Sequence, residues 1–211
     1  MKNFEDIFNT LPSGSSTKWK HYFEIYDHFF SNFRDKKINV LEIGVQNGGS
    51  LKMWKEYFKN AKIYGLDIDP SCQKFGNKNT RIFIGDQSNL NFLNETAKII
   101  GELDIIIDDG SHIMQDQIIS LQTLFPYLQE GGIYLIEDLH TSYLQGYGGS
   151  YKGENTCLEF LKELIDSINR QASAKPDYFI ENLSSMHIYK SVAVLIKGMR
   201  NPSKQVTAGE N

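Results

Sequence analysis

Two short acidic segments carry the residue types best suited to chemistry in this sequence of 211 residues. Asp108–His112, with the sequence DDGSH, follows the apolar run 103–107, and Glu137-Asp138 follows the apolar run 132–136. The length and β-branched content of both runs are typical of strands buried in a parallel sheet. Residues 114–128 have helical spacing and lead into two glycines, so the unit is predicted to be a strand, a helix and a second strand.

We expect the two acidic segments to meet, because a right-handed crossover puts the carboxyl ends of both strands on one edge of the sheet. Asp109 and Glu137 should be near neighbours, with Asp138 and His112 beside them. Three carboxylates do not stay ionised together cheaply. A divalent cation held by oxygen ligands would remove their repulsion and leave the imidazole placed to accept a proton. Asp108 adjoins Asp109, so the ligand choice is open by one residue, and an acidic rim without metal is the simpler alternative.

Three earlier segments predict a nucleoside pocket at the same sheet. A strand over 38–44 breaks into a glycine-bearing turn, the strand 62–67 ends on Asp67, and the strand 81–85 is followed by Asp86. Glycines at such a turn let a ligand approach the backbone. A carboxylate at the end of the second strand can bind both hydroxyls of a ribose, and the residues after the third could bind an adenine amino group. Helix capping or turn formation would explain any one acid among Glu42, Asp67 and Asp86. Three acids at three successive strand ends are hard to assign to capping alone.

The glycine spacing disfavours a dinucleotide cofactor, and with it an adenine-nucleotide-dependent oxidoreductase. A dinucleotide fingerprint needs G-x-G-x-x-G, whereas the glycines here are Gly44, Gly48 and Gly49. Glu42 lies two residues before the first of them. An acid there repels a pyrophosphate but suits an α-ammonium group.

These motifs resemble those of a known enzyme class. The segments 40–44 (VLEIG), 65–67 (GLD) and 85–86 (GD) are similar to the successive cofactor motifs of class I S-adenosylmethionine-dependent methyltransferases. The segments 107–112 (IDDGSH) and 134–143 (YLIEDLHTSY) resemble more narrowly the metal-dependent sugar O-methyltransferases of macrolide and rhamnosyl-polyketide biosynthesis, and more loosely cephalosporin-hydroxylase-type proteins. The resemblance extends from about Lys18 to Lys197.

This resemblance implies an α/β fold with a Rossmann-like, doubly wound seven-stranded sheet, mostly parallel with a C-terminal antiparallel hairpin. It implies transfer of a methyl group from S-adenosylmethionine to a hydroxyl of a sugar or glycosylated metabolite. The matching positions imply Mg²⁺, or another divalent cation, on Asp109, Glu137 and Asp138, with His112 as general base and His140 as a second candidate. The expected cofactor-binding residues are Glu42, Gly44, Gln46, Asn47, Ser50, Asp67, Asp86, Gln87 and Asp108.

Two alternatives to this enzyme remain. One is a non-catalytic module that binds S-adenosylmethionine or a metal. The other is a cephalosporin-hydroxylase-like enzyme, although no two-His-one-carboxylate redox set is evident. The macrolide enzymes also carry a large N-terminal domain that these 211 residues do not include, so the oligomeric state, including a homo-oligomer, is left open.

Composition narrows the partners. The formal net charge is −4 and there is no block of five basic residues, which argues against nucleic acid. We expect a small-molecule or glycan acceptor. No run of 18 apolar residues and no signal-peptide core occur, so we expect a cytoplasmic protein without membrane insertion. Cys72 and Cys157 fit neither a metal spacing nor a disulfide framework.

We expect one domain, divided into a helical N-terminal segment (1–35), a methyltransferase domain (36–198) and a flexible tail (199–211). An aromatic helical stripe over 19–33 is predicted to pack on the sheet, although Lys18, His21 and Tyr22 could cover the cofactor. The Gly- and Tyr-rich stretch 140–156 is either a substrate lid or a mobile surface loop. A helix over 157–170 should precede a hairpin of 185–189 and 192–196 at the sheet edge.

Overall fold

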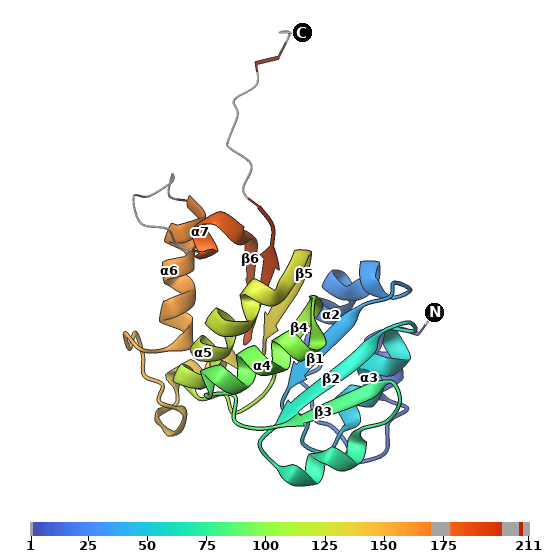
Figure 1. Cartoon of the computed structure of the whole chain (residues 1–211). Helices are drawn as coiled ribbons and strands as arrows, with labels where there is room; N and C mark the ends of the chain where they lie inside the picture. Colours follow the sequence, from blue (N-terminus) through green and yellow to red (C-terminus); the bar gives the residue numbers. More distant parts are fainter. Residues whose placement is uncertain (1, 170–177, 200–206, 209–211) are drawn as a thin grey trace.

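Parallel strands make up most of the central sheet in the computed structural model, which describes residues 2–169, 178–199 and 207–208 (Figure 1). The strands are β1 (Asn39–Ile43), β2 (Lys62–Asp67), β3 (Thr80–Ile84), β4 (Leu103–Asp108), β5 (Leu128–Ile136), β6 (Leu183–Tyr189) and β7 (Val192–Lys197). Their order is β3-β2-β1-β4-β5-β7-β6, with β1 to β5 parallel and β7 antiparallel to both neighbours. The predicted fold class and edge hairpin are confirmed.

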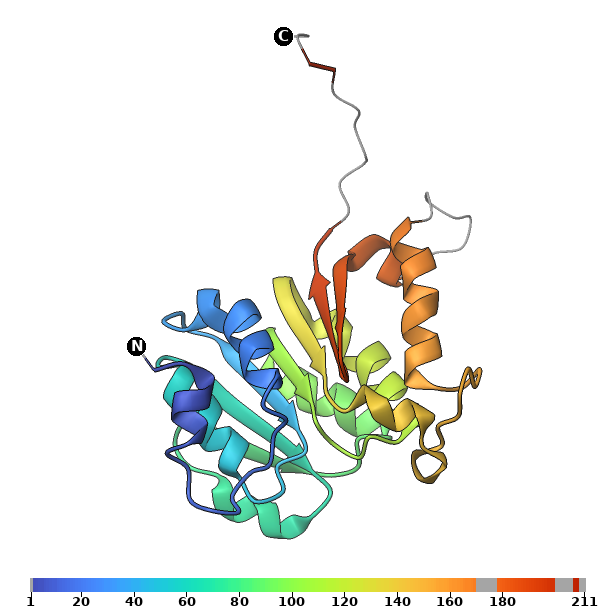
Figure 2. The same cartoon turned by 180° about the vertical axis from the view of Figure 1, so that it is seen from behind.

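Helices cover both faces of this sheet (Figures 1 and 2). The α-helices are α1 (Phe4–Phe8), α2 (Tyr22–Phe30), α3 (Gly49–Tyr57), α4 (Leu90–Ile100), α5 (Met114–Leu124), α6 (Cys157–Asn169) and α7 (Tyr178–Asn182). The 3₁₀ turns are η1 (Ser31–Phe33), η2 (Pro70–Phe75), η3 (Phe125–Tyr127), η4 (Leu139–Tyr143) and η5 (Gln145–Tyr147). In the described part of the chain, no helix has the length and apolar character needed to cross a membrane.

Alternation of side chains along the strands creates two separate cores. Val40 and Ile105 belong to the core under α1, α2 and α3, whereas Leu41 and Ile106 belong to the core under α4 to α7. Successive residues of a strand point to opposite faces, so a strand covered on both sides is apolar at nearly every position. This explains why the two runs before the acidic segments lack a polar face.

The strand register places the functional segments side by side. Ile43 pairs with both Leu66 and Asp108, and Asp108 pairs with Ile136. The next backbone amide continues each ladder: Asp109 N donates to Ile43 O at 3.0 Å, and Glu137 N donates to Asp108 O at 2.9 Å. The acidic residues therefore leave the sheet together at its carboxyl edge, where ligands bind in open α/β folds.

Several element boundaries differ from the sequence expectation. The helix predicted over 114–128 ends at Leu124, because Pro126 has no backbone N–H to continue it, and Leu128 already begins β5. The aromatic helix begins only at Tyr22. The stretch 140–156 contains parts of η4 and all of η5. The three predicted domain boundaries remain predictions, and most of the expected tail 199–211 lies outside the described residues.

Candidate active site

A cavity of about 1030 Å³ opens at the carboxyl edge of the sheet, between the strand ends and the N-terminal segment 15–22. Its wall includes most of the residues singled out from the sequence. These are Gly44, Gln46, Asn47, Ser50, Asp67, Asp86, Gln87, Asp109, His112, Glu137 and Asp138. Glu42 and Asp108 are not among the lining residues, and both side chains are fully buried behind the wall.

Gly44 makes the close approach of two strand ends possible. It has a φ of +91°, and a Cβ atom there would lie 2.0 Å from the carbonyl oxygen of Asp109. Any larger residue would therefore push the turn after β1 away from Asp109, which follows β4. Gly44, which was expected from the sequence to allow a ligand to approach, therefore also allows the ends of β1 and β4 to lie close together.

Asp67 organises the turn after β1. Its Oδ2 accepts hydrogen bonds from the backbone amides of Val45 at 2.7 Å and Gln46 at 2.9 Å, and its Oδ1 accepts from Asp69 N at 2.9 Å. Gln46 adopts a φ of +48°, which the two amide bonds to Asp67 help to hold. This carboxylate thus shapes the cavity whether or not it also binds a ribose.

Glu42 is held by two buried donors, Trp54 Nε1 and Ser50 Oγ, each at 2.8 Å. Burial raises the pKa of its carboxyl group to about 7, while Lys18 and the two donors act in the opposite direction. Ser50 is consequently engaged within the protein. Glu42 faces α3 rather than the open cavity, so its role toward a ligand stays a prediction.

Asp108 and Gln87 form a second buried network. Asp108 accepts from the Tyr134 hydroxyl at 3.1 Å and from Gln87 Nε2 at 3.3 Å, and burial raises its pKa to about 7. Gln87 also donates to Ser120 Oγ and accepts from Ser111 N at 2.7 Å. Gln87, which is bonded to Asp108, therefore holds the segment that carries Asp109 and His112.

The remaining predicted cofactor residues, Asp86 and Asn47, also line the cavity. Asp86 is exposed and accepts a turn bond from Ser88 N at 2.8 Å. Asn47 donates to Gly14 O at 3.2 Å, which ties the β1 turn to the N-terminal segment. Asp86 is free to meet a ligand that enters the cavity.

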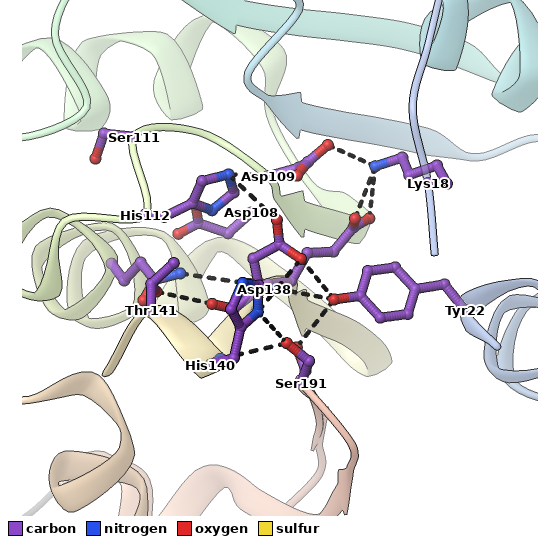
Figure 3. A network of polar contacts seen from close by, with 12 residues as sticks. Lys18, Tyr22, Asp108, Asp109, Ser111, His112, Asp138, His140, Thr141 and Ser191 are labelled. Atoms are coloured by element: carbon purple, nitrogen blue, oxygen red, sulfur yellow. Dashed lines mark hydrogen bonds and ion pairs between the residues drawn. The ribbon is translucent and has the colours of Figure 1, made fainter. Parts of the chain in front are cut away.

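Asp109, His112 and Asp138 form a cluster that could hold a metal ion, with one ligand atom from each residue within 4.8 Å of the others. His112 Nε2 lies 3.7 Å from Asp109 Oδ1 and 3.7 Å from Asp138 Oδ2 (Figure 3). His112 and Asp138 both adopt left-handed backbone conformations, with φ of +57° and +55°. Such strained residues gather at functional sites.

Glu137 lies on the inner side of this cluster and is bound by Lys18. The Lys18 ammonium donates to Asp109 Oδ2 at 2.5 Å and to the two Glu137 oxygens at 2.9 and 2.8 Å. Burial lowers the pKa of Lys18, but the nearby carboxylates of Asp109 and Glu137 together raise it by more. The pKa of Lys18 therefore lies above its ordinary value. Burial, followed by repulsion from the Asp109 carboxylate, raises the pKa of Glu137, while Lys18 and Tyr26 act in the opposite direction.

The two tyrosines of α2 reach the same carboxylates. Tyr26 donates to Glu137 Oε1 at 2.6 Å and Tyr22 to Asp138 Oδ1 at 2.6 Å. They are four residues apart and therefore point from the same face of the helix. The aromatic stripe packs on the sheet, as predicted. Tyr22 was expected only as a possible cover for the cofactor, and the bonds of both hydroxyls to the carboxylates were not predicted. The spacing of four residues between Tyr22 and Tyr26 was the signal in the sequence that both hydroxyls lie on one face of the helix.

His140 is the more exposed of the two site histidines. Its Nδ1 lies 2.6 Å from Ser191 Oγ in the β6–β7 turn and 3.9 Å from Asp138 Oδ1 (Figure 3). His112, in contrast, is mostly buried, and its Nδ1 has no partner. His112 thus faces two carboxylates with Nε2, whereas His140 is tied to a hydroxyl outside the acidic cluster. His187 lies in β6, against Phe29.

The donor set fits a hard divalent cation. Carboxylate oxygens predominate, Asp109 Oδ1 and Asp138 Oδ2 face a common space, and an imidazole nitrogen lies between them. Oxygen-rich sets of this kind suit Mg²⁺ or Ca²⁺. Both oxygens of Glu137 accept from Lys18, so Glu137 can become a ligand only if these bonds change.

No family model matches the chain, but individual proteins do. It is 38% identical over 213 aligned residues to an 8-demethyl-8-(2-methoxy-α-L-rhamnosyl)-tetracenomycin-C 3'-O-methyltransferase of Streptomyces olivaceus, covering 92% of this chain. It is 39% identical to a mycinamicin VI 2''-O-methyltransferase of Micromonospora griseorubida, covering 82% of this chain. A crystal structure of the methyltransferase MycE with Mg, SAH and mycinamycin VI superposes with a TM-score of 0.87 at 35% identity over 94% of this chain.

The chain belongs to the class I S-adenosylmethionine-dependent methyltransferases. Within them it is related to the sugar O-methyltransferases of macrolide and tetracenomycin biosynthesis. The chain spans about half the length of these relatives: 54% of the tetracenomycin enzyme, 47% of the mycinamicin enzyme and 54% of the MycE chain. The methyltransferase family is thus shown for this sequence.

Proposed function

We propose that this protein transfers a methyl group from S-adenosylmethionine to a hydroxyl of a sugar in a glycosylated small molecule, with a divalent cation. One observation carries the proposal. The cavity bounded by the β1, β2 and β3 strand ends is continuous with the cluster of Asp109, His112 and Asp138. A methyl donor in the first part would lie next to a proton acceptor and cation ligands in the second.

The cofactor half is built by the turn after β1 and the acids that follow it. We assign the ribose to Asp67 and the adenine side to Asp86 and Gln87, because these residues line the cavity at successive strand ends. Gly44, Gln46 and Asn47 would contact the amino acid part of the cofactor. Glu42 and Asp108 would act from behind the wall, through the hydrogen bonds that fix it, and Ser50 links Glu42 to the wall itself.

Asp109 and Asp138 would hold the cation, and Glu137 would join them after its bonds to Lys18 rearrange. When bound, S-adenosylmethionine supplies an electrophilic methyl group and the cation supplies Lewis acidity toward the acceptor. His112 Nε2 accepts the proton of the acceptor hydroxyl. The two flanking carboxylates then stabilise the imidazolium that forms. Bound S-adenosylmethionine would supply the methyl group to the acceptor oxygen, and the electron pair of the sulfur–methyl bond would remain on sulfur.

Two aromatic side chains lie near the site histidines and would bind the acceptor. The Trp19 ring is 54% exposed and lies 6.2 Å from His140, and the Tyr147 ring lies 6.4 Å from His112. Tyr143 and Tyr151 stack on each other at 6.3 Å. Such rings pack on sugar faces and donate hydrogen bonds. We therefore assign 140–156 to the acceptor side, and we place the enzyme in the cytoplasm with a small-molecule or glycan acceptor.

Methyl transfer from radiolabelled S-adenosylmethionine tests the proposal. The acceptors to screen are glycosylated polyketides, sugar nucleotides and surface-glycan fragments, each with Mg²⁺ and with excess EDTA. Label transferred to an acceptor with Mg²⁺ but not with EDTA is the expected result. Cofactor binding without transfer to any of these classes would favour a non-catalytic binding module, and transfer that persists in a metal-free preparation would remove the cation from the mechanism.

A further inference from the structure

Lys18 is the most deeply buried ammonium of the site. Its side chain is only 2% exposed, which is unusual for a lysine unless it is paired. An ammonium has three N–H donors, and the three short contacts of Lys18 are to Asp109 Oδ2 and to both oxygens of Glu137. Figure 3 shows the side chain reaching from the N-terminal segment to Asp109, which follows β4.

These contacts leave Glu137 without a free carboxylate oxygen, whereas Asp109 keeps one oxygen that is not bound to Lys18. Both Glu137 oxygens are occupied, since Oε1 also accepts from Tyr26. Asp109 has one oxygen on Lys18 and the other 3.7 Å from His112. A cation that takes Glu137, or both oxygens of Asp109, must therefore displace the ammonium or share these atoms with it.

We propose that Lys18 is an internal counter-ion that positions Asp109 and Glu137, and that a divalent cation competes with it for these carboxylates. This inference rests on the proposed cation site. Two positive charges a few ångströms apart in a poorly solvated site repel each other strongly, so the ammonium weakens cation binding. In return it keeps the carboxylates together when no cation is bound. The enzyme would thus release its cation more readily than the carboxylates alone would allow.

Removal of the charge tests the idea without any acceptor. Lys18→Met, with Lys20→Met as matched control, is titrated with Mn²⁺ by calorimetry, and thermal unfolding is followed in EDTA. Lys20 is two residues away, its side chain is 83% exposed, and its partner is Glu5. We expect Lys18→Met to bind Mn²⁺ at least tenfold more tightly than wild type and to unfold at a lower temperature in EDTA. Lys20→Met should match wild type in both.

Charge-conserving and neutral variants complete the test. Lys18→Arg should keep the wild-type Mn²⁺ affinity, because it keeps the charge. Lys18→Gln, which still donates hydrogen bonds, decides the matter if Lys18→Met does not fold. If the neutral variants bind Mn²⁺ as tightly as wild type or more weakly, Lys18 does not compete with the cation. The proposed cation site would still stand. A lack of Mn²⁺ binding by every form, wild type included, overturns the cation site of the proposed function and this inference with it.

Discussion

The phenol of Tyr22 donates a 2.6 Å hydrogen bond to Asp138 Oδ1, across 116 residues of sequence. The same hydroxyl lies 3.3 Å from Asp138 N, which donates to it. Asp138 has a left-handed backbone, so these two bonds help to hold a residue in a conformation that it does not favour. The direction of its second oxygen, Oδ2, toward His112 depends on this support.

We therefore expect Tyr22→Phe to weaken cation binding without altering the cofactor half. Loss of a hydrogen bond that orients a metal ligand typically costs about 10-fold to 100-fold in metal affinity. Mn²⁺ and S-adenosylhomocysteine titrations of the variant measure the two effects separately. Tyr189→Phe, which removes a partly exposed hydroxyl, is the control. Unchanged Mn²⁺ affinity in Tyr22→Phe would show that Asp138 needs no such support.

Substitution of His112 and of His140 should have different effects on turnover and on Mn²⁺ affinity. If His112 Nε2 is the base, His112→Ala should lose about 10² to 10⁴ in turnover, the usual contribution of a general base, with Mn²⁺ and cofactor affinity retained. If His112 is instead a metal ligand, Mn²⁺ affinity falls with it. His140→Ala should cost less, because Nδ1 is tied to Ser191. Single-turnover rates and Mn²⁺ titrations of both variants decide, and a larger rate loss at His140 would move the base there.

Asp67→Ala should impair both the cofactor and the turn after β1. A ribose held by a carboxylate loses charge-assisted hydrogen bonds worth roughly 1.5–3 kcal/mol each, so we expect at least a tenfold rise in the Kd of S-adenosylhomocysteine. The turn also loses the two amide bonds of Val45 and Gln46, which should lower the unfolding temperature. Calorimetry and thermal unfolding measure both. Asp69→Ala, whose carboxylate accepts from Ser71, should change binding far less, and equal losses in the two variants would remove Asp67 from the ribose.

Asp108 should make the protein less stable as the pH rises through the acid range. Burial raises its pKa to about 7 from an ordinary value of 3.8, so the folded state holds the proton more tightly than the unfolded chain does. Its stabilising effect is complete below about pH 4 and is lost as the pH rises to about 7. Asp108→Asn cannot ionise and should flatten this part of the profile.

Urea unfolding of wild type and Asp108→Asn in EDTA, at intervals from pH 4 to pH 8, checks this expectation. Glu42 also has a raised pKa, so part of the wild-type slope should persist in the variant. Asp35→Asn, at a well-exposed position, controls for a change in net charge. Parallel profiles for wild type and Asp108→Asn would contradict the buried, proton-binding state of Asp108.

Local sequence patterns predicted the parts of the site that depend on a strand and its end. The apolar runs, the acids that follow them and the crossover were enough to bring Asp109, Glu137 and Asp138 to one edge. The contacts of Lys18 were not predictable in this way. They span 91 and 119 residues, and they depend on how the segment before α2 crosses the sheet, for which no periodicity exists. Glu42 is the opposite case. Its buried partners Ser50 and Trp54 lie on the next helix, only 8 and 12 residues away, so these contacts depend on local sequence, although they were not predicted.

The turn between β6 and β7 has a consequence for synthesis of the chain. Ser191 contacts Leu139, His140 and Tyr22, so the last hairpin braces the catalytic edge. Domains generally fold as units as they leave the ribosome. The support of His140 by Ser191 is added only with the last hairpin, so the catalytic edge is incomplete until β7 has emerged. A chain that is still being synthesised should therefore have no ordered His140 before that point.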